Sequence, residues 1–102
     1  MKENALSKLI DNYLRVLESR RIAWRLNVAG SATQRGGVPD FLICYKGHFV
    51  AIELKQPDGT YDVTKRQAAH MKRIESAGGY TKKIESVREL DEFLKKISPR
   101  EI

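Results

Sequence analysis

The sequence predicts an α/β protein in which a mixed central β-sheet is flanked by helices, in the element order α, β, β, β, α, β, α. Three observations indicate this class: apolar residues recur at helical spacing near both ends and again in the second half, β-rich runs lie between them, and Gly-containing turns separate the segments. A chain of 102 residues suffices for one hydrophobic core. We therefore expect residues 1–102 to form a single domain.

The first element is an amphipathic helix over residues 3–20. Its apolar residues recur every three or four positions, which is typical of a helix with one buried face, and Glu3 begins the same stripe. The apolar members are Leu6, Leu9, Ile10, Tyr13, Leu14 and Leu17.

A short strand follows over residues 22–28, where apolar and polar residues alternate. Trp24 and Leu26 share one side of this strand and are expected in the core. Arg25 and Asn27 lie on the other side.

Two β-rich runs, residues 39–45 and 48–55, are joined by Lys46 and Gly47. Two residues of this kind predict a tight hairpin in which the glycine supplies a positive φ. Pro39 suits the first position of a strand, where no ladder donor is needed.

Two helices and one strand complete the order. Thr64 followed by Gln67, and Ser86 followed by Glu89, have the spacing of capping boxes and mark the two helix starts. Between the helices, residues 80–84 (YTKKI) read as a short edge strand. The apolar residues of the two helices are Ala68, Ala69, Met71, Ile74 and Ala77, then Val87, Leu90, Phe93, Leu94 and Ile97.

Composition favours a soluble protein that meets a polyanion. The chain has 19 Lys and Arg against 13 Asp and Glu, a net charge of +6, which is common in nucleic-acid-binding proteins but also in others. Its longest apolar runs, FLIC and FVAI, are too short to span a bilayer, and no signal core precedes them. We expect a soluble, cytoplasmic protein with no membrane partner. Cys44 has no partner at metal-ligand spacing and is interpreted as a small buried apolar residue.

The hairpin register brings charged residues together. If Tyr45 pairs with His48, Asp40 faces Glu53, and the Cβ atoms of such opposite residues lie about 4.5–5.5 Å apart. Lys55 shares the face of Glu53 because side chains in a strand alternate with a period of two. A three-residue turn or a bulge would shift the register and separate these charges.

Asp40, Glu53 and Lys55 in this arrangement suit a divalent-cation site. Two carboxylates about 5 Å apart repel by roughly 3 kcal/mol at an effective dielectric of about 20. Lys55 offsets one charge, and the remaining oxygen-rich pocket suits Mg²⁺ held by one or two carboxylates plus substrate phosphate. The alternative is an ordinary ion-pair cluster on a solvated sheet face. We favour the metal site because Glu53 interrupts an apolar run and the helices need sheet surface to pack on.

The Pro-Asp pair at one strand start, followed by Glu, one apolar residue and Lys at the next strand end, resembles the PD…ExK active site of restriction-endonuclease-like phosphodiesterases. More of the chain matches: WRLN before a Gly-containing loop, GGVPDFLICYKGHFVAIELK, TKRQ at a helix start and AGG at a helix end. Together they resemble the VRR-NUC family, virus-type replication-repair nucleases, over nearly the whole chain. The resemblance implies a restriction-endonuclease-like fold and a stand-alone nuclease domain.

The resemblance also implies roles for individual residues. Asp40 and Glu53 match the metal-binding carboxylates, the Leu54 backbone carbonyl matches a further metal ligand, and Lys55 matches the catalytic lysine. Glu3 matches an acidic residue of the first helix that is a candidate ligand. The implied cofactor is Mg²⁺ or Mn²⁺, with no nucleotide cofactor.

Gln67 matches a polar residue placed to touch the lysine or a water at the site, although the capping box with Thr64 is an equal explanation. Arg25 and Asn27 resemble the family's strand pattern or simply face solvent. The candidate nucleic-acid contacts are Gln34 and Arg35 in the polar segment 29–37, and Lys65 and Arg66 at a helix start. Basic residues on a helix are more often a solvated face than a phosphate contact.

The function expected from the resemblance is metal-dependent hydrolysis of DNA phosphodiester bonds, with branched DNA such as flaps or Holliday junctions as substrate, in a virus- or phage-related replication and repair setting. Paired incisions need two active sites, so a symmetric homodimer is expected. Three alternatives stand: a general nuclease, a basic DNA-binding module with a structural charge cluster, and a structural subunit without salt-sensitive DNA affinity.

Overall fold

The computed structural model describes residues 2–28, 37–55 and 63–100, with side chains described from Ala5 onward. The helices are α1 (Lys2–Ser19), α2 (Lys65–Ser76) and α3 (Val87–Lys95). The strands are β1 (Ala23–Asn27), β2 (Phe41–Tyr45), β3 (His48–Leu54) and β4 (Tyr80–Ile84). The predicted element order is confirmed.

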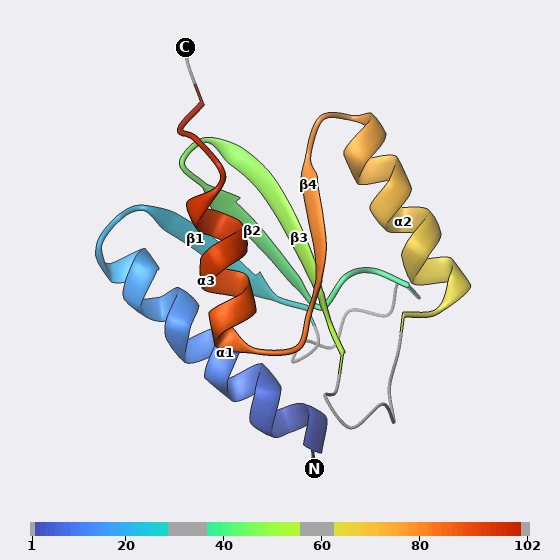
Figure 1. Cartoon of the computed structure of the whole chain (residues 1–102), viewed down its shortest axis with the longest axis horizontal. Helices are drawn as coiled ribbons and strands as arrows, with labels where there is room; N and C mark the ends of the chain where they lie inside the picture. Colours follow the sequence, from blue (N-terminus) through green and yellow to red (C-terminus); the bar gives the residue numbers. More distant parts are fainter. Residues whose placement is uncertain (1, 29–36, 56–62, 101–102) are drawn as a thin grey trace.

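The four strands form one mixed sheet in the order β1-β2-β3-β4 (Figure 1). β1 with β2 and β2 with β3 are antiparallel, whereas β3 with β4 is parallel. A parallel pair needs a long crossover, and α2 provides it. β4 is therefore an edge strand, as predicted.

The hairpin has the register predicted from its two-residue turn. Tyr45 pairs with His48, and Phe41 pairs with Ile52. Lys46 and Gly47 both have positive φ, 50° and 89°, as a type I′ turn requires. The next position along this register sets Asp40 beside Glu53.

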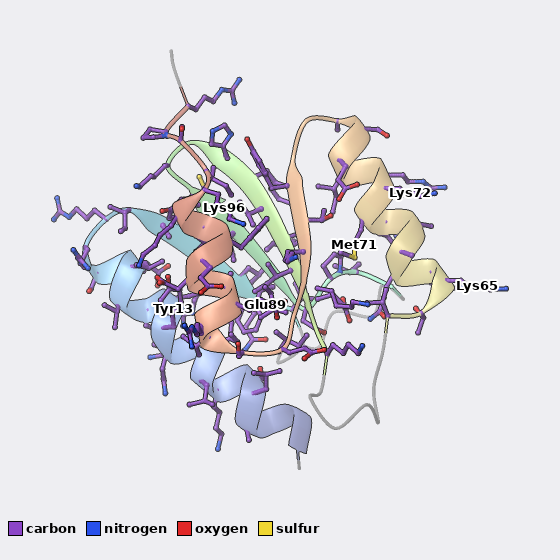
Figure 2. The ribbon with its side chains drawn as sticks, viewed as in Figure 1. Tyr13, Lys65, Met71, Lys72, Glu89 and Lys96 are labelled. Atoms are coloured by element: carbon purple, nitrogen blue, oxygen red, sulfur yellow. The ribbon has the colours of Figure 1, made fainter. Side chains whose placement is uncertain are left out.

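The hydrophobic core lies between the sheet and the two helices α1 and α3 (Figure 1). Its largest fully buried apolar side chains are Phe41, Ile10, Leu14, Ile43, Ile52, Ile84, Leu90, Leu94 and Val50. Burying each such side chain stabilises the fold by about 1.5–3 kcal/mol. Tyr13 of α1 lies against α3 (Figure 2), where its hydroxyl donates to Asp91 Oδ1 at 2.7 Å.

Strand β1 faces α1 with its polar side. Arg25 Nε contacts Asp11 Oδ1 at 2.6 Å, and its Nη1 contacts Glu18 Oε1 at 2.5 Å. The backbone N–H of Arg25 also donates to Glu18 Oε2 at 3.3 Å, at the free edge of the sheet. This inverts the predicted sides of β1, because Arg25 is drawn inward by two carboxylates of α1.

The other face of the sheet is covered by α2 only over β3 and β4. Trp24 and Leu26, predicted to be core, are 56% and 44% exposed, and Phe49 of β3 is 48% exposed. Cys44, interpreted as buried, is exposed. These predictions were wrong because strand alternation shows which residues share a face and not which face a helix covers.

One predicted helix cap is confirmed in full and the other in part. The side chain of Thr64 accepts from the Gln67 N–H, and the Gln67 side chain accepts from the Thr64 N–H. Ser86 accepts from the Glu89 N–H at 3.1 Å, but Glu89 Oε1 accepts from the N–H of Glu85 at 2.7 Å. Within the described helices, none combines the length and apolar character that a bilayer crossing requires.

Candidate active site

Asp40 is held at the open end of the hairpin by both neighbouring strands. Its carboxylate Oδ2 accepts from the backbone N–H of Leu54 at 2.9 Å. Its backbone carbonyl accepts from the N–H of Val28 at 2.8 Å, just beyond β1. The carboxylate is thereby fixed beside the last residues of β3.

Glu53 is completely buried, with 0% of its surface exposed. It lies on β3 in the row that contains Asp40, beneath the start of α2. Its Oε2 accepts a hydrogen bond from the side-chain Nε2 of Gln67, which is itself buried. A carboxylate is expensive to bury unless it is hydrogen-bonded, paired or bound to a cation, so the solvated ion-pair cluster does not describe this residue.

Gln67 combines two contacts in one side chain. Its Oε1 accepts from the Thr64 N–H at 2.8 Å, while its Nε2 donates to Glu53. The capping role is therefore compatible with a contact at the candidate site, and the contact is with Glu53 rather than with the lysine or water that the resemblance implied. Because the Gln67 Oε1 is fixed by the Thr64 N–H, the orientation of the amide is set and its Nε2 points toward the Glu53 carboxylate.

Lys55 follows β3 directly and continues its parallel pairing with β4. Its backbone N–H donates to the Ile84 carbonyl at 2.8 Å, and its Nζ lies 3.7 Å from Glu85 Oε2. Glu53 pairs with Lys83 in the parallel register. Opposite charges thus alternate along this part of β3 and β4, with Glu53 beside Lys83 and Lys55 beside Glu85.

Lys83 and Glu85 are the residues near the site that sequence reasoning missed. Their signal is the alternation in TKKIE, residues 81–85, which puts them on one side of an edge strand. That alternation identifies neighbours of Glu53 only once the register with β3 is known. The register depends on how the α2 crossover packs and is not encoded locally.

Leu54 contributes its backbone and not its side chain to this end of the sheet. The side chain is 4% exposed within the core. In antiparallel pairing the N–H and C=O of one residue point toward the same neighbouring strand. The carbonyl of Leu54 therefore shares the direction of its N–H, which is bonded to Asp40.

The remaining predicted residues lie around this centre or outside the described part of the chain. Glu3 is in α1, but its side chain is outside the described residues, and so are Gln34 and Arg35. Lys65 points away from the sheet at the start of α2 (Figure 2). Arg66 packs on Gly37, which has a φ of 82°, and a Cβ added there would overlap Arg66 Cγ.

The donor set fits a hard divalent cation. Among the described residues no group of three or more His, Cys, Asp or Glu side chains is placed to hold a metal ion. Asp40 and Glu53 nevertheless present carboxylates whose orientation is set by the Leu54 N–H and the Gln67 amide. Mg²⁺ is commonly bound by only one or two carboxylates, with waters and substrate phosphate completing its shell.

No family model matches the sequence, and no curated protein matches it significantly. A solved structure described as "VRR_NUC domain" superposes on this chain with a TM-score of 0.71 at 18% sequence identity. The superposition covers 96% of this chain and 99% of that chain. It shows that the two share a fold, and it agrees with the resemblance seen in the sequence motifs.

Proposed function

We propose that this chain, which has the fold of a VRR_NUC domain, is a metal-dependent nuclease that hydrolyses DNA phosphodiester bonds. The fully buried Glu53, which directly precedes the Leu54 N–H that the Asp40 carboxylate binds, is the observation that carries the proposal. A structural role for charge on a sheet does not require a carboxylate to be taken entirely out of water. A cation-binding site, in contrast, explains why the Glu53 carboxylate is completely buried.

Each residue of the site has a distinct role in this proposal. Asp40, Glu53 and the Leu54 carbonyl would hold Mg²⁺ or Mn²⁺, with Glu3 as a further ligand from α1. When bound, such a cation polarises the scissile phosphate and lowers the pKa of a coordinated water. Gln67 holds the Glu53 carboxylate in its binding orientation.

Lys55 supplies a positively charged side chain to the site, in addition to the charge of the metal ion. Its ammonium orients the attacking water and offsets the negative charge that develops as the phosphodiester bond breaks. Glu85, with its carboxylate 3.7 Å from Nζ, keeps this flexible side chain near the site. Glu85 is therefore a positioning residue in this proposal.

The finer proposal is that the substrate is branched DNA, a flap or a Holliday junction, cut by a symmetric homodimer. Its support is the sequence resemblance together with the need for two sites when two strands are cut. Gln34, Arg35, Lys65 and Arg66 are proposed to contact the sugar-phosphate backbone. Such contacts position the DNA without reading its sequence.

The test is cleavage of end-labelled junction, flap and linear DNA with Mg²⁺ or Mn²⁺, with EDTA as the common control. Glu53→Gln and Lys55→Ala should each lower the rate by about 10²-fold or more, as expected when a group that stabilises the transition state is lost. Lys82→Ala is the matched control, because Lys82 is exposed on β4 in the row of Ile52, opposite the site.

Two results would overturn the proposal. One is a wild-type protein that binds DNA but cuts none of the substrates with either metal. The other is cleavage that persists unchanged in folded Glu53→Gln and Lys55→Ala variants. Either result would favour the DNA-binding module, and the preference among substrates separates junction resolution from general nuclease activity.

A further inference from the structure

A shallow groove lies at the end of the sheet away from the candidate active site, where α1 leads into β1 and where β2 turns into β3. It is lined by Arg21, Ile22, Ala23, Trp24, Cys44, Lys46 and Gly47. Trp24 is 56% exposed there. The lining contains two basic residues and no acidic one.

Both basic residues of the groove have left-handed backbone conformations. Arg21 has a φ of 62° and Lys46 a φ of 50°, and among the described residues these are the non-glycine residues with positive φ. Arg21 follows the last turn of α1, where its N–H donates to the Glu18 carbonyl at 3.0 Å and the next N–H donates to Leu17. Glycine is the usual residue at such a helix end.

Lys46 occupies the first central position of the type I′ turn, where Asn, Asp or Gly is preferred. At two positions where the backbone conformation favours a non-basic residue, the chain therefore has Arg or Lys. The turn and the helix end explain the conformations but not the choice of Arg and Lys. Strained residues of this kind gather at functional sites, and here both line one groove.

The groove and the candidate active site are on the same side of the sheet. Trp24, Cys44 and Phe49 form one row across three strands. Glu53 lies on the same side, four residues beyond Phe49 on β3. At about 3.3 Å per residue this separates the two rows by about 13 Å along the strand.

We propose that this groove binds single-stranded DNA, with an unpaired base stacked on Trp24 and neighbouring phosphates held by Arg21 and Lys46. An indole ring offers a stacking surface that accepts any base, and only a base that is not paired in a duplex has a face open to it. Phe49, half-exposed in the same row, provides a second apolar surface. The choice of DNA as ligand rests on the proposed function, whereas binding in the groove needs neither metal nor catalysis.

The cations that the proposal assigns to phosphate binding are Arg21 and Lys46, the two basic residues that line the groove. Lys46 Nζ lies over the ring of Tyr45, 5.2 Å from its centroid. Tyr45 is a buried core residue on the face of the sheet opposite Trp24, so the Lys46 ammonium has to leave this ring in order to hold a phosphate in the groove. The net charge of +6 also favours an anionic strand over a neutral partner.

The first test uses the fluorescence of Trp24, which is the single tryptophan of the chain. The protein is titrated in EDTA with a short oligothymidylate and, separately, with a duplex of equal length. We expect saturable quenching by the single strand and a weaker response to the duplex. In an anisotropy assay with labelled oligothymidylate, Trp24→Ala should weaken binding about tenfold to a hundredfold.

The second test asks whether Arg21 and Lys46 serve binding or structure, by comparing the change in melting temperature with the change in DNA affinity. Arg21→Gly and Lys46→Asn suit the backbone better than the natural residues, so the melting temperature should be unchanged or higher. Affinity for the single strand should nevertheless fall, and the slope of log K against log salt should become shallower by about 0.7 for each phosphate that the protein no longer neutralises. Arg88→Gln removes the same charge from an exposed site on α3 and is the matched control.

Several outcomes would overturn the inference. Unquenched Trp24 at low salt would do so, as would equal loss of affinity in Arg21→Gly and Arg88→Gln. A dimer that dissociates in Trp24→Ala, without any response to the oligonucleotide, would show that a second copy of the chain covers the groove. Because binding is measured in EDTA, absence of nuclease activity would leave this result intact.

Discussion

At the scale of single residues, Gln67 links the start of α2 to the candidate metal ligand Glu53. The link has two parts, a backbone cap shared with Thr64 and a side-chain hydrogen bond to the buried carboxylate. Thr64→Ala removes only the half of the cap that Thr64 provides, whereas a substitution of Gln67 removes the other half together with the hydrogen bond to Glu53. The two substitutions therefore distinguish helix stability from support of the site.

We predict that Thr64→Ala lowers the free energy of unfolding by about 1 kcal/mol, the usual cost of losing an N-cap. Its metal-dependent cleavage should be nearly unchanged. Gln67→Ala should cost about 1–3 kcal/mol more, because buried Glu53 loses a donor, and cleavage should fall. Urea unfolding and cleavage rates measure the two effects. Equal loss of cleavage in both variants would assign the effect to the helix start alone.

At the scale of elements, β1 is attached to α1 through the ion pairs of Arg25. The hydrogen bond from Arg25, opposed by desolvation on burial, lowers the pKa of Asp11 below its usual value of 3.8. A carboxyl with a depressed pKa contributes stability that is present above its unfolded pKa and is lost as the pH falls through its folded pKa. The attachment of β1 should therefore weaken only in strong acid.

We predict that Arg25→Gln lowers the free energy of unfolding by about 2 kcal/mol at pH 7, since hydrogen bonds between charged groups are lost. The decline in stability below pH 3.8 should also become shallower than in wild type. The measurement is urea unfolding from neutral pH to about pH 2.5, the region where ion-paired carboxylates protonate. Arg15→Gln serves as control, because Arg15 contacts the same Asp11 from a side chain that is 64% exposed. Identical pH profiles for Arg25→Gln and wild type would contradict the assignment.

At the scale of the whole molecule, the proposed cation couples the site to global stability. Glu53→Gln should raise the melting temperature in EDTA, because a buried charge is removed. Mg²⁺, or Ca²⁺ as a substitute that avoids turnover, should stabilise wild type by about 2.7 kcal/mol at a concentration of 100 Kd. Glu53→Gln should lose this response. A thermal shift that is equal in both proteins would place the bound metal elsewhere.

The parts of the fold that the sequence predicted depend on neighbouring residues. Lys46 and Gly47 determine the turn, the turn determines the register, and the register brings Asp40 beside Glu53. The cap formed by Thr64 and Gln67 likewise needs only a short stretch of chain.

What could not be predicted depends on distant packing. The sides of β1 were inverted because α1 carries the carboxylates that draw Arg25 inward. The exposure of Trp24 and Cys44 follows from α2 covering β3 and β4. The hydrogen bond between Gln67 and Glu53 and the pairing of Glu53 with Lys83 both require the crossover to be packed in place.

The carboxylate of Glu18 has a consequence for how copies of this chain can assemble. By accepting the outward N–H of Arg25, it occupies a donor that an added strand would need at the margin of the sheet. Two molecules joined through β1 would have to break this bond and the ion pair behind it. The proposed homodimer should therefore not be joined through β1, and this edge of the sheet is protected against the addition of further strands that leads to fibres.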